Sequence, residues 1–139
     1  MKRVLSIAVL LLLLPASSGV ADDKEAISKA QGAAKAWLAL VDGTKYGESW
    51  DEAASLLKAA VTKADFERTF KGVRAPLGPA KSRVIKSATF SRTLPGVPDG
   101  EYVVVQFDTR FENKAGAVET VTPMHEKDGS WRVSGYYIK

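Results

Sequence analysis

The stretch that decides the fold is YVVVQFDTRF, residues 102–111. Its odd-numbered positions carry β-branched and aromatic side chains: Val103, Val105, Phe107, Thr109 and Phe111. The positions between them turn polar after Val104: Gln106, Asp108 and Arg110. A period of two in residues of this kind predicts an antiparallel strand with one buried and one exposed face. The rest of the chain should supply neighbouring strands and a cover for the apolar face.

Three further strands are expected beside this one, and each is bounded by turn-forming residues: 82–93, 117–126 and 131–138. The loop 94–100 contains two prolines and two glycines, and the later turns fall at 113–116 and 127–129. The order of these segments predicts a meander of four antiparallel strands.

Three helices are expected upstream, because apolar residues recur there every three to four positions. The first spans residues 23–41 and ends at Gly43, and the second spans 48–60. The third starts at Thr62 as N-cap and stops at Pro76. The sequence thus predicts an α+β fold of three N-terminal helices packed on a curved four-stranded antiparallel sheet. The expected core is Ile27, Trp37, Leu38, Leu57, Phe66, Phe70, Val103, Val105, Phe107, Trp131 and Val133.

Residues 1–21 have the pattern of a signal peptide. Lys2 and Arg3 precede an apolar run over residues 4–14, and Ala21 ends a segment of mostly small residues. Eleven residues rise about 16 Å as a helix, against about 30 Å for the hydrocarbon core of a bilayer. We therefore expect cleavage after Ala21, a single soluble domain over 22–139 with no transmembrane segment, and a periplasmic or secreted location. The alternative is an uncleaved anchor.

Several motifs together resemble one family of exported bacterial domains. They are Ser49–Asp51, Val73–Gly78, Leu94–Gly96, Pro98–Tyr102, Glu119–Met124 and Trp131–Tyr137. The family is known only as domain of unknown function 4019, and the resemblance covers nearly all of residues 22–139. It implies a bacterial envelope protein and no assigned catalytic residues. The order of elements is also similar, more loosely, to the cystatin-like or nuclear-transport-factor-2-like cone, which hosts enzymes and binding modules alike.

Several kinds of catalytic or cofactor site find no support in the sequence. The chain has one histidine, no cysteine and no tight acidic cluster, so no metal site or other cofactor is expected. No glycine-rich loop opens a helix, and no serine lies in a nucleophile-elbow pattern. These observations favour a binding or interaction module over an enzyme.

The enzymatic alternative depends on His125, which could act as a general base beside Glu119, Asp108 or Asp128. Alternation along 117–126 places Glu119 and His125 on one face and Thr120 and Met124 on the other, unless Pro123 introduces a bulge. The second group is expected to line the concave face, so that this face would contain no acid or base. Such an apolar concavity suggests core or a ligand pocket.

Aromatic and basic residues supply the remaining candidates. Tyr46 and Trp50 could line the mouth of a pocket, and Tyr136 could bind a ligand, since Tyr136 and Tyr137 point to opposite faces. Between Arg68 and Pro98 the chain has seven basic residues and no acidic one: Arg68, Lys71, Arg74, Lys81, Arg83, Lys86 and Arg92.

This basic band could bind an anionic envelope component or another envelope protein through Arg74, Arg83 and Lys86, with nucleic acid not expected. The other interpretation is a solvated surface balanced by acids from neighbouring elements. The oligomeric state stays open.

Overall fold

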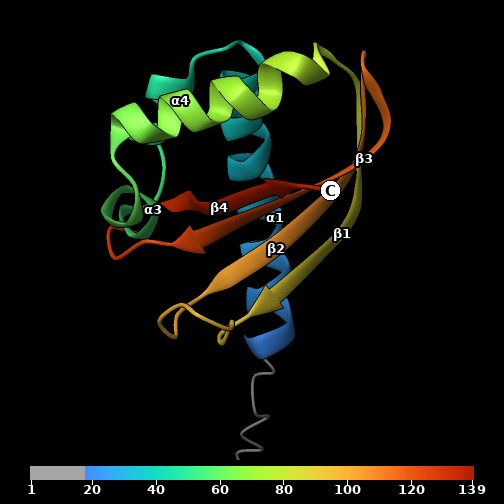
Figure 1. Cartoon of the computed structure of the whole chain (residues 1–139). Helices are drawn as coiled ribbons and strands as arrows, with labels where there is room; N and C mark the ends of the chain where they lie inside the picture. The colour runs from blue at the N-terminus through green and yellow to red at the C-terminus, as the bar shows by residue number, and fades with distance from the viewer. Residues whose placement is uncertain (1–17) are drawn as a thin grey trace, which may run out of the picture.

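Helices precede a four-stranded sheet in the computed structural model, which describes residues 18–139 (Figure 1). The helices are α1 (Ser18–Asp42), α2 (Tyr46–Asp51), α3 (Ser55–Ala60), α4 (Lys63–Arg74) and the short 3-10 helix η1 (Ala75–Leu77). The strands are β1 (Ala80–Ser91), β2 (Tyr102–Phe111), β3 (Lys114–His125) and β4 (Trp131–Ile138). Each strand pairs antiparallel with the next in chain order. The predicted α+β class is confirmed.

The core lies between α1 and one face of the sheet. α1 contacts all four strands, and Figure 1 shows it behind the sheet while α4 passes along the margin next to β4. The odd-numbered residues of β2 are all buried, as the alternation predicts. Of the expected core residues, Ile27, Phe70 and Trp131 are partly buried and pack against the rest, and the others are buried.

The second predicted helix is wrong as a single element, because α2 and α3 divide it at residues 52–54. Ala54 is extended, with φ −64° and ψ 151°. Its backbone N–H donates a hydrogen bond of 2.8 Å to the carbonyl oxygen of Val133 in β4. The break therefore fastens the α2–α3 connection to the sheet.

The end of α1 has a Schellman-type cap. The N–H of Lys45 donates to the oxygen of Leu40 at 2.9 Å, and the N–H of Thr44 donates to the oxygen of Val41 at 3.0 Å. Gly43 does mark the end of the helix, but the left-handed residue is Thr44, with φ 60°. A β-branched residue in this conformation is strained.

The side-chain direction predicted for the third strand of the meander, β3, is wrong. Phe107 of β2 lies opposite Glu119, and the residues of β3 that share the helix-covered face are odd-numbered. These are buried: Ala117, Glu119, Val121 and Pro123. A register shift near the β2–β3 turn inserts an extra residue into β3, which exchanges the two faces relative to the prediction.

The predicted leader 1–21 lies mostly outside the described residues, which begin at Ser18 inside α1. None of the helices from α1 to α4 is long and apolar enough to cross a membrane.

Candidate functional site

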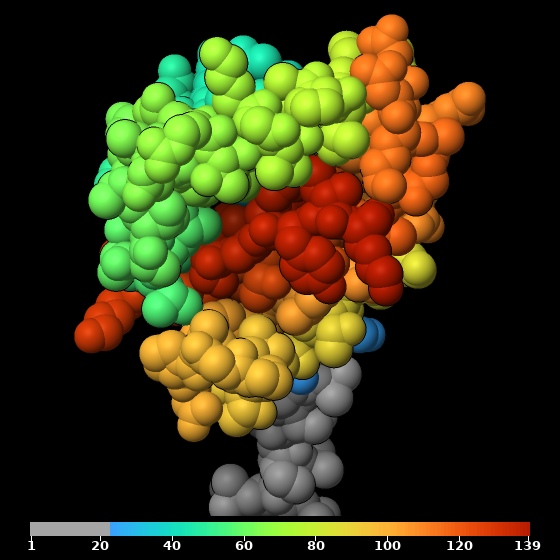
Figure 2. Space-filling view, viewed as in Figure 1, coloured from blue at the N-terminus to red at the C-terminus, as the bar shows by residue number. Residues whose placement is uncertain are grey.

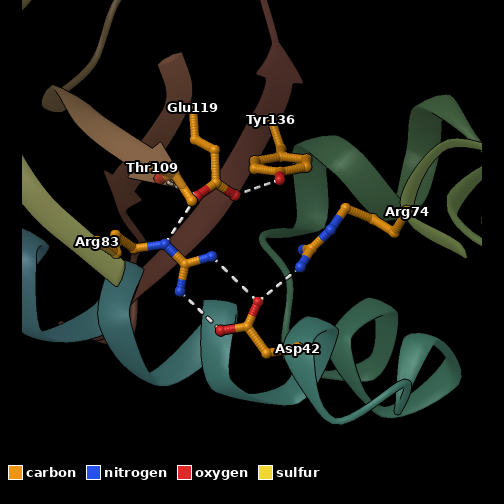
Figure 3. Close-up of polar contacts among 6 residues, drawn as sticks. All are labelled: Asp42, Arg74, Arg83, Thr109, Glu119 and Tyr136. Carbon is orange, nitrogen blue, oxygen red and sulfur yellow. Dashed lines mark hydrogen bonds and ion pairs between the residues drawn. The ribbon is translucent and has the colours of Figure 1, made fainter. Parts of the chain in front are cut away.

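Six elements meet at a largely buried network of polar and charged side chains (Figure 3). Its members are Asp42 at the end of α1, Arg74 at the end of α4, Arg83 on β1, Thr109 on β2, Glu119 on β3 and Tyr136 on β4. We call these six residues the ion-pair network. Because its members come from residues 42 to 136, the network joins the helical layer to all four strands.

Arg83 is the centre of this network. Its Nη1 lies 2.7 Å from Oδ2 of Asp42, and its Nη2 lies 3.0 Å from Oδ1 of the same carboxylate. Its Nε donates to Oε1 of Glu119 at 2.7 Å. One guanidinium therefore bridges two acids, with a bidentate geometry at Asp42.

Glu119 is fully buried on the helix-covered face, so the expectation of an acid-free concave face is wrong. Besides Arg83, the hydroxyl groups of Thr109 and Tyr136 donate to its carboxylate. Burying a carboxylate is costly unless it is paired and hydrogen-bonded. Three donors meet that requirement here.

Arg74 completes the charge balance. Its Nη2 lies 2.7 Å from Oδ1 of Asp42, and its side chain is 4% exposed. The guanidinium lies 4.8 Å above the ring of Phe111, while its Nε and Nη1 have no hydrogen-bond partner among the described residues. A cation over an aromatic face is electrostatically favourable and compensates in part.

The proposed surface role of Arg74 and Arg83 therefore does not fit their positions. Arg74 is buried, and the side chain of Arg83 is only 17% exposed. The two arginines face two carboxylates, a pairing that the sequence could not reveal. The basic band thus loses two of its seven charges to internal ion pairs.

The pKa directions agree with a network that keeps its charges near neutral pH. Burial disfavours the charge of Asp42, but hydrogen bonds from Arg83 and Arg74 outweigh it and lower the pKa of that carboxyl. Burial, followed by the charge of Glu119, raises the pKa of the Tyr136 phenol well above its usual range. This arrangement can hold elements together but offers no free acid or base for proton transfer.

A second feature, an apolar groove, runs between α4 and β4. It consists of two hollows of about 260 and 250 Å³ that share Thr69, Phe70 and Tyr136. We call it the α4–β4 groove, and its lining is Leu57, Val61, Phe66, Thr69, Phe70, Val73, Gly135, Tyr136, Tyr137 and Ile138. Figure 2 shows β4 (dark red) recessed below α4 (green) and above the β1–β2 connection.

Exposed apolar side chains gather at this groove. Three large hydrophobic side chains stand out as exposed within the described part of the chain: Val73, Val84 and Tyr137. Val73 (48% exposed) and Tyr137 (58% exposed) both line the α4–β4 groove, whereas Val84 lies on β1. Clustered exposed apolar groups beside a hollow are typical of interaction surfaces.

Tyr136 connects the network to the groove. Its ring stacks on Phe70 at 5.5 Å and meets Trp37 edge-on at 5.2 Å, and its hydroxyl donates to Glu119. The predicted candidate Tyr136 thus lines the groove, and its hydrogen bond to Glu119 fixes the position of its ring.

Comparison with known protein families gives a match over the region that contains these residues. A family model described as protein of unknown function (DUF4019) matches residues 33–136. The chain belongs to the DUF4019 family. The matched region runs from α1 into β4 and includes every member of the ion-pair network. No curated protein matches the sequence.

The histidine of this DUF4019 domain lies away from two of its three expected partners, Glu119 and Asp108. Glu119 is six residues back along β3, about 20 Å at 3.3–3.4 Å per residue. Asp108 is exposed on the outer face and pairs with Val118, seven residues from His125. The pairs with Glu119 and Asp108 are therefore not formed in the structure, and the carboxylate of Asp128 accepts hydrogen bonds from Ser130 instead.

His125 instead holds the end of the sheet. Its Nδ1 lies 2.6 Å from Oε2 of Glu101, its Nε2 lies 3.2 Å from the oxygen of Gly129, and its ring stacks on Trp131 at 4.9 Å. Both ring nitrogens face acceptors, so neither is free for a substrate. Glu101 was missed because it precedes the strand in a polar loop.

The remaining candidates are dispersed. Lys86 is exposed at a register shift in β1. Tyr46 is half-buried and packs near Phe70, with ring centres 6.2 Å apart. Trp50 is half-buried, and its indole N–H donates to the oxygen of Val61 at 2.9 Å. Tyr46 and Trp50 thus lie one turn apart on α2, whereas Lys86 lies on β1. Within residues 18–139, no group of three histidine or acidic side chains is placed to hold a metal ion.

Proposed function

We propose that this DUF4019 domain is an exported, non-enzymatic interaction module of the bacterial envelope, and that its partner binds in the α4–β4 groove. The observation that carries the proposal is the pair of exposed apolar side chains, Val73 on α4 and Tyr137 on β4, which both line one of the two adjoining apolar hollows. A solvent-exposed apolar strip of this kind costs free energy unless something covers it.

Export is supported by the sequence of the leader. A basic start, a short apolar run and small residues before Ala21 match a cleavable signal peptide. We propose cleavage after Ala21, which would give a mature chain starting at Asp22 in the periplasm or medium. The intact mass of the protein recovered from those fractions tests this: a mass that retains residues 1–21 would contradict it.

The enzymatic alternative has less support from the geometry. Each carboxylate oxygen of Glu119 accepts a hydrogen bond from inside the protein, and its side chain has no exposed surface. The imidazole of His125 is held at both nitrogens. A general base must reach the proton it abstracts. Glu119 is enclosed by the protein, and His125, which lines a surface hollow, already faces an acceptor at each ring nitrogen.

Between the two kinds of partner expected from the sequence, the geometry favours another envelope protein over an anionic polymer or lipid. Two of the basic residues are paired inside the fold, and Arg68 pairs with Asp65 at 2.5 Å on the surface. An apolar groove is better suited to apolar side chains than to phosphate or carboxylate groups.

A photo-reactive amino acid placed at Tyr137 in living cells tests the proposal. We expect a discrete cross-linked product there and none from the same probe at Val84, which is equally exposed on the opposite edge of the sheet. The product should disappear when Val73→Lys is introduced on α4. Equal products at both probe positions, or a product indifferent to Val73→Lys, would contradict a groove-specific partner.

A further inference from the structure

The two free edges of the sheet differ in how well they are protected. β1 and β4 are the outer strands. In β1, register shifts between Ala80 and Ser82 and between Ile85 and Ser87 leave Lys81 and Lys86 outside the pairing. Lysines and bulges are the usual devices that prevent a free edge from pairing with another strand. β1 is therefore a poor template for strand addition.

The first half of β4 is also protected. The oxygen of Val133 accepts the hydrogen bond from the N–H of Ala54, so the α2–α3 connection covers this part of the edge. Ser134 is the extra residue opposite Pro123, and its hydroxyl donates to the oxygen of Thr122 at 2.7 Å. The bulge accommodates a proline, which has no N–H to donate.

The second half of β4 is open, and its pairing pattern shows which backbone groups are free. Val118 and Lys139 exchange two hydrogen bonds, of 3.0 and 2.9 Å. In an antiparallel ladder such pairs alternate with pairs whose N–H and C=O groups point away from each other. Ile138 and Tyr136 occupy the alternate positions, opposite Glu119 and Val121. Their backbone groups therefore point away from β3, and no hydrogen bond joins their N–H groups to another part of the described chain.

We propose that the α4–β4 groove binds an extended peptide strand of another exported protein. The strand would pair with the backbone of Tyr136 and Ile138 and insert apolar side chains into the two hollows. This inference rests on the proposed function and names the chemistry of the partner.

An extended strand suits this place better than a helix does. Main-chain donors and acceptors at alternate residues are matched by another strand, whereas a helix satisfies its own backbone groups internally. Side chains on one face of a strand recur about every 7 Å, which suits two adjoining hollows that share Phe70 and Tyr136. The partner segment should therefore carry apolar residues at alternate positions.

The test uses nine-residue peptides, blocked at both ends, selected for binding from a random display library. We expect the selected peptides to alternate apolar residues and to protect the amide protons of Tyr136 and Ile138 from exchange. Ile138→Pro removes one outward N–H, and a lost hydrogen bond of this kind should weaken binding about tenfold. Ile138→Val keeps the N–H and is the matched control, expected to bind within about twofold of wild type.

N-methylated peptides separate pairing from any misfolding of the proline variant. Backbone N–H groups of alternate peptide residues point toward β4 in such a pairing. N-methylation of one alternating set of residues should abolish binding, and N-methylation of the other set should leave it intact. Binding that does not depend on which set is methylated would overturn strand pairing. Failure to select any peptide with a Kd below about 1 mM would overturn it as well. A homodimer lost in Ile138→Pro would make a second copy the occupant, which also contradicts the inference. If cross-linking at Tyr137 persists in either case, the proposed function still holds and only the inference of strand pairing is contradicted.

Discussion

Replacing Glu119 by glutamine is the most direct test of the ion-pair network. Glutamine has nearly the same shape, so the change creates no cavity and removes only the charge. It leaves the guanidinium of Arg83 without one of its two acids and places an amide N–H₂ near hydroxyl donors. Breaking one partner of a buried ion pair costs about 3–5 kcal/mol. With a urea slope of about 1.5 kcal/mol per M, the unfolding midpoint should fall by about 2–3 M.

Equilibrium unfolding in urea, followed by tryptophan fluorescence, measures this effect. Asp108→Asn is the control, because it removes a carboxylate from the exposed outer face of the neighbouring strand and should change the free energy of unfolding by less than about 0.5 kcal/mol. A double-mutant cycle with Arg83→Met should show strong coupling to Glu119→Gln. If Glu119→Gln unfolds within about 0.5 M of wild type, the network contributes little and the reasoning is refuted.

Three smaller predictions concern pH and backbone strain. The pKa of Asp42 is lowered by its arginines in spite of burial, so the stabilisation that this carboxylate contributes is fully present above about pH 4 and is lost as pH falls through the folded-state pKa. Thermal unfolding measured from pH 2 to 5 should therefore depend less on pH in Asp42→Asn than in the wild type. The pKa of Tyr136 is raised, so stability should fall as pH rises above about 10, where only the unfolded state ionises, and Tyr136→Phe should lack that fall. Thr44→Gly should raise the free energy of unfolding by roughly 1 kcal/mol because glycine adopts φ 60° without strain, and a lowered melting temperature would contradict this.

The sheet and the first helix could be predicted because their signals are local. The alternation in β2 agrees with burial at each odd-numbered position. Trp37 and Leu38 lie on a helical stripe that is buried as expected. The split of the second helix could not be predicted in the same way. It depends on a hydrogen bond between Ala54 and Val133, which are far apart in sequence and adjacent only in the folded chain.

The direction of Glu119 was mispredicted for a physical reason. Both faces of β3 contain apolar residues, with Ala117 and Val121 on one face and Val118 and Met124 on the other. The pattern therefore does not indicate which face is buried. An acid then biases the choice toward solvent, since carboxylates are rarely fully buried. One extra residue near the β2–β3 turn sets which face of β3 is buried, and the position of that residue depends on strand pairing rather than on composition.

Contacts between residues that are distant in sequence also explain why the basic run has the pattern of a surface band. The acids that neutralise Arg74 and Arg83 come from the end of α1 and from β3, so a scan along the run finds no compensation. Arg74 directly follows Val73 at the end of α4, and Tyr136 is both a donor to Glu119 and the floor of the α4–β4 groove. Ion pairs that fix the end of α4 and a hydrogen bond that fixes the ring of Tyr136 together hold the two walls of the groove at a set separation. A groove held in this way loses little conformational entropy when it binds an extended partner, and such preorganisation favours binding.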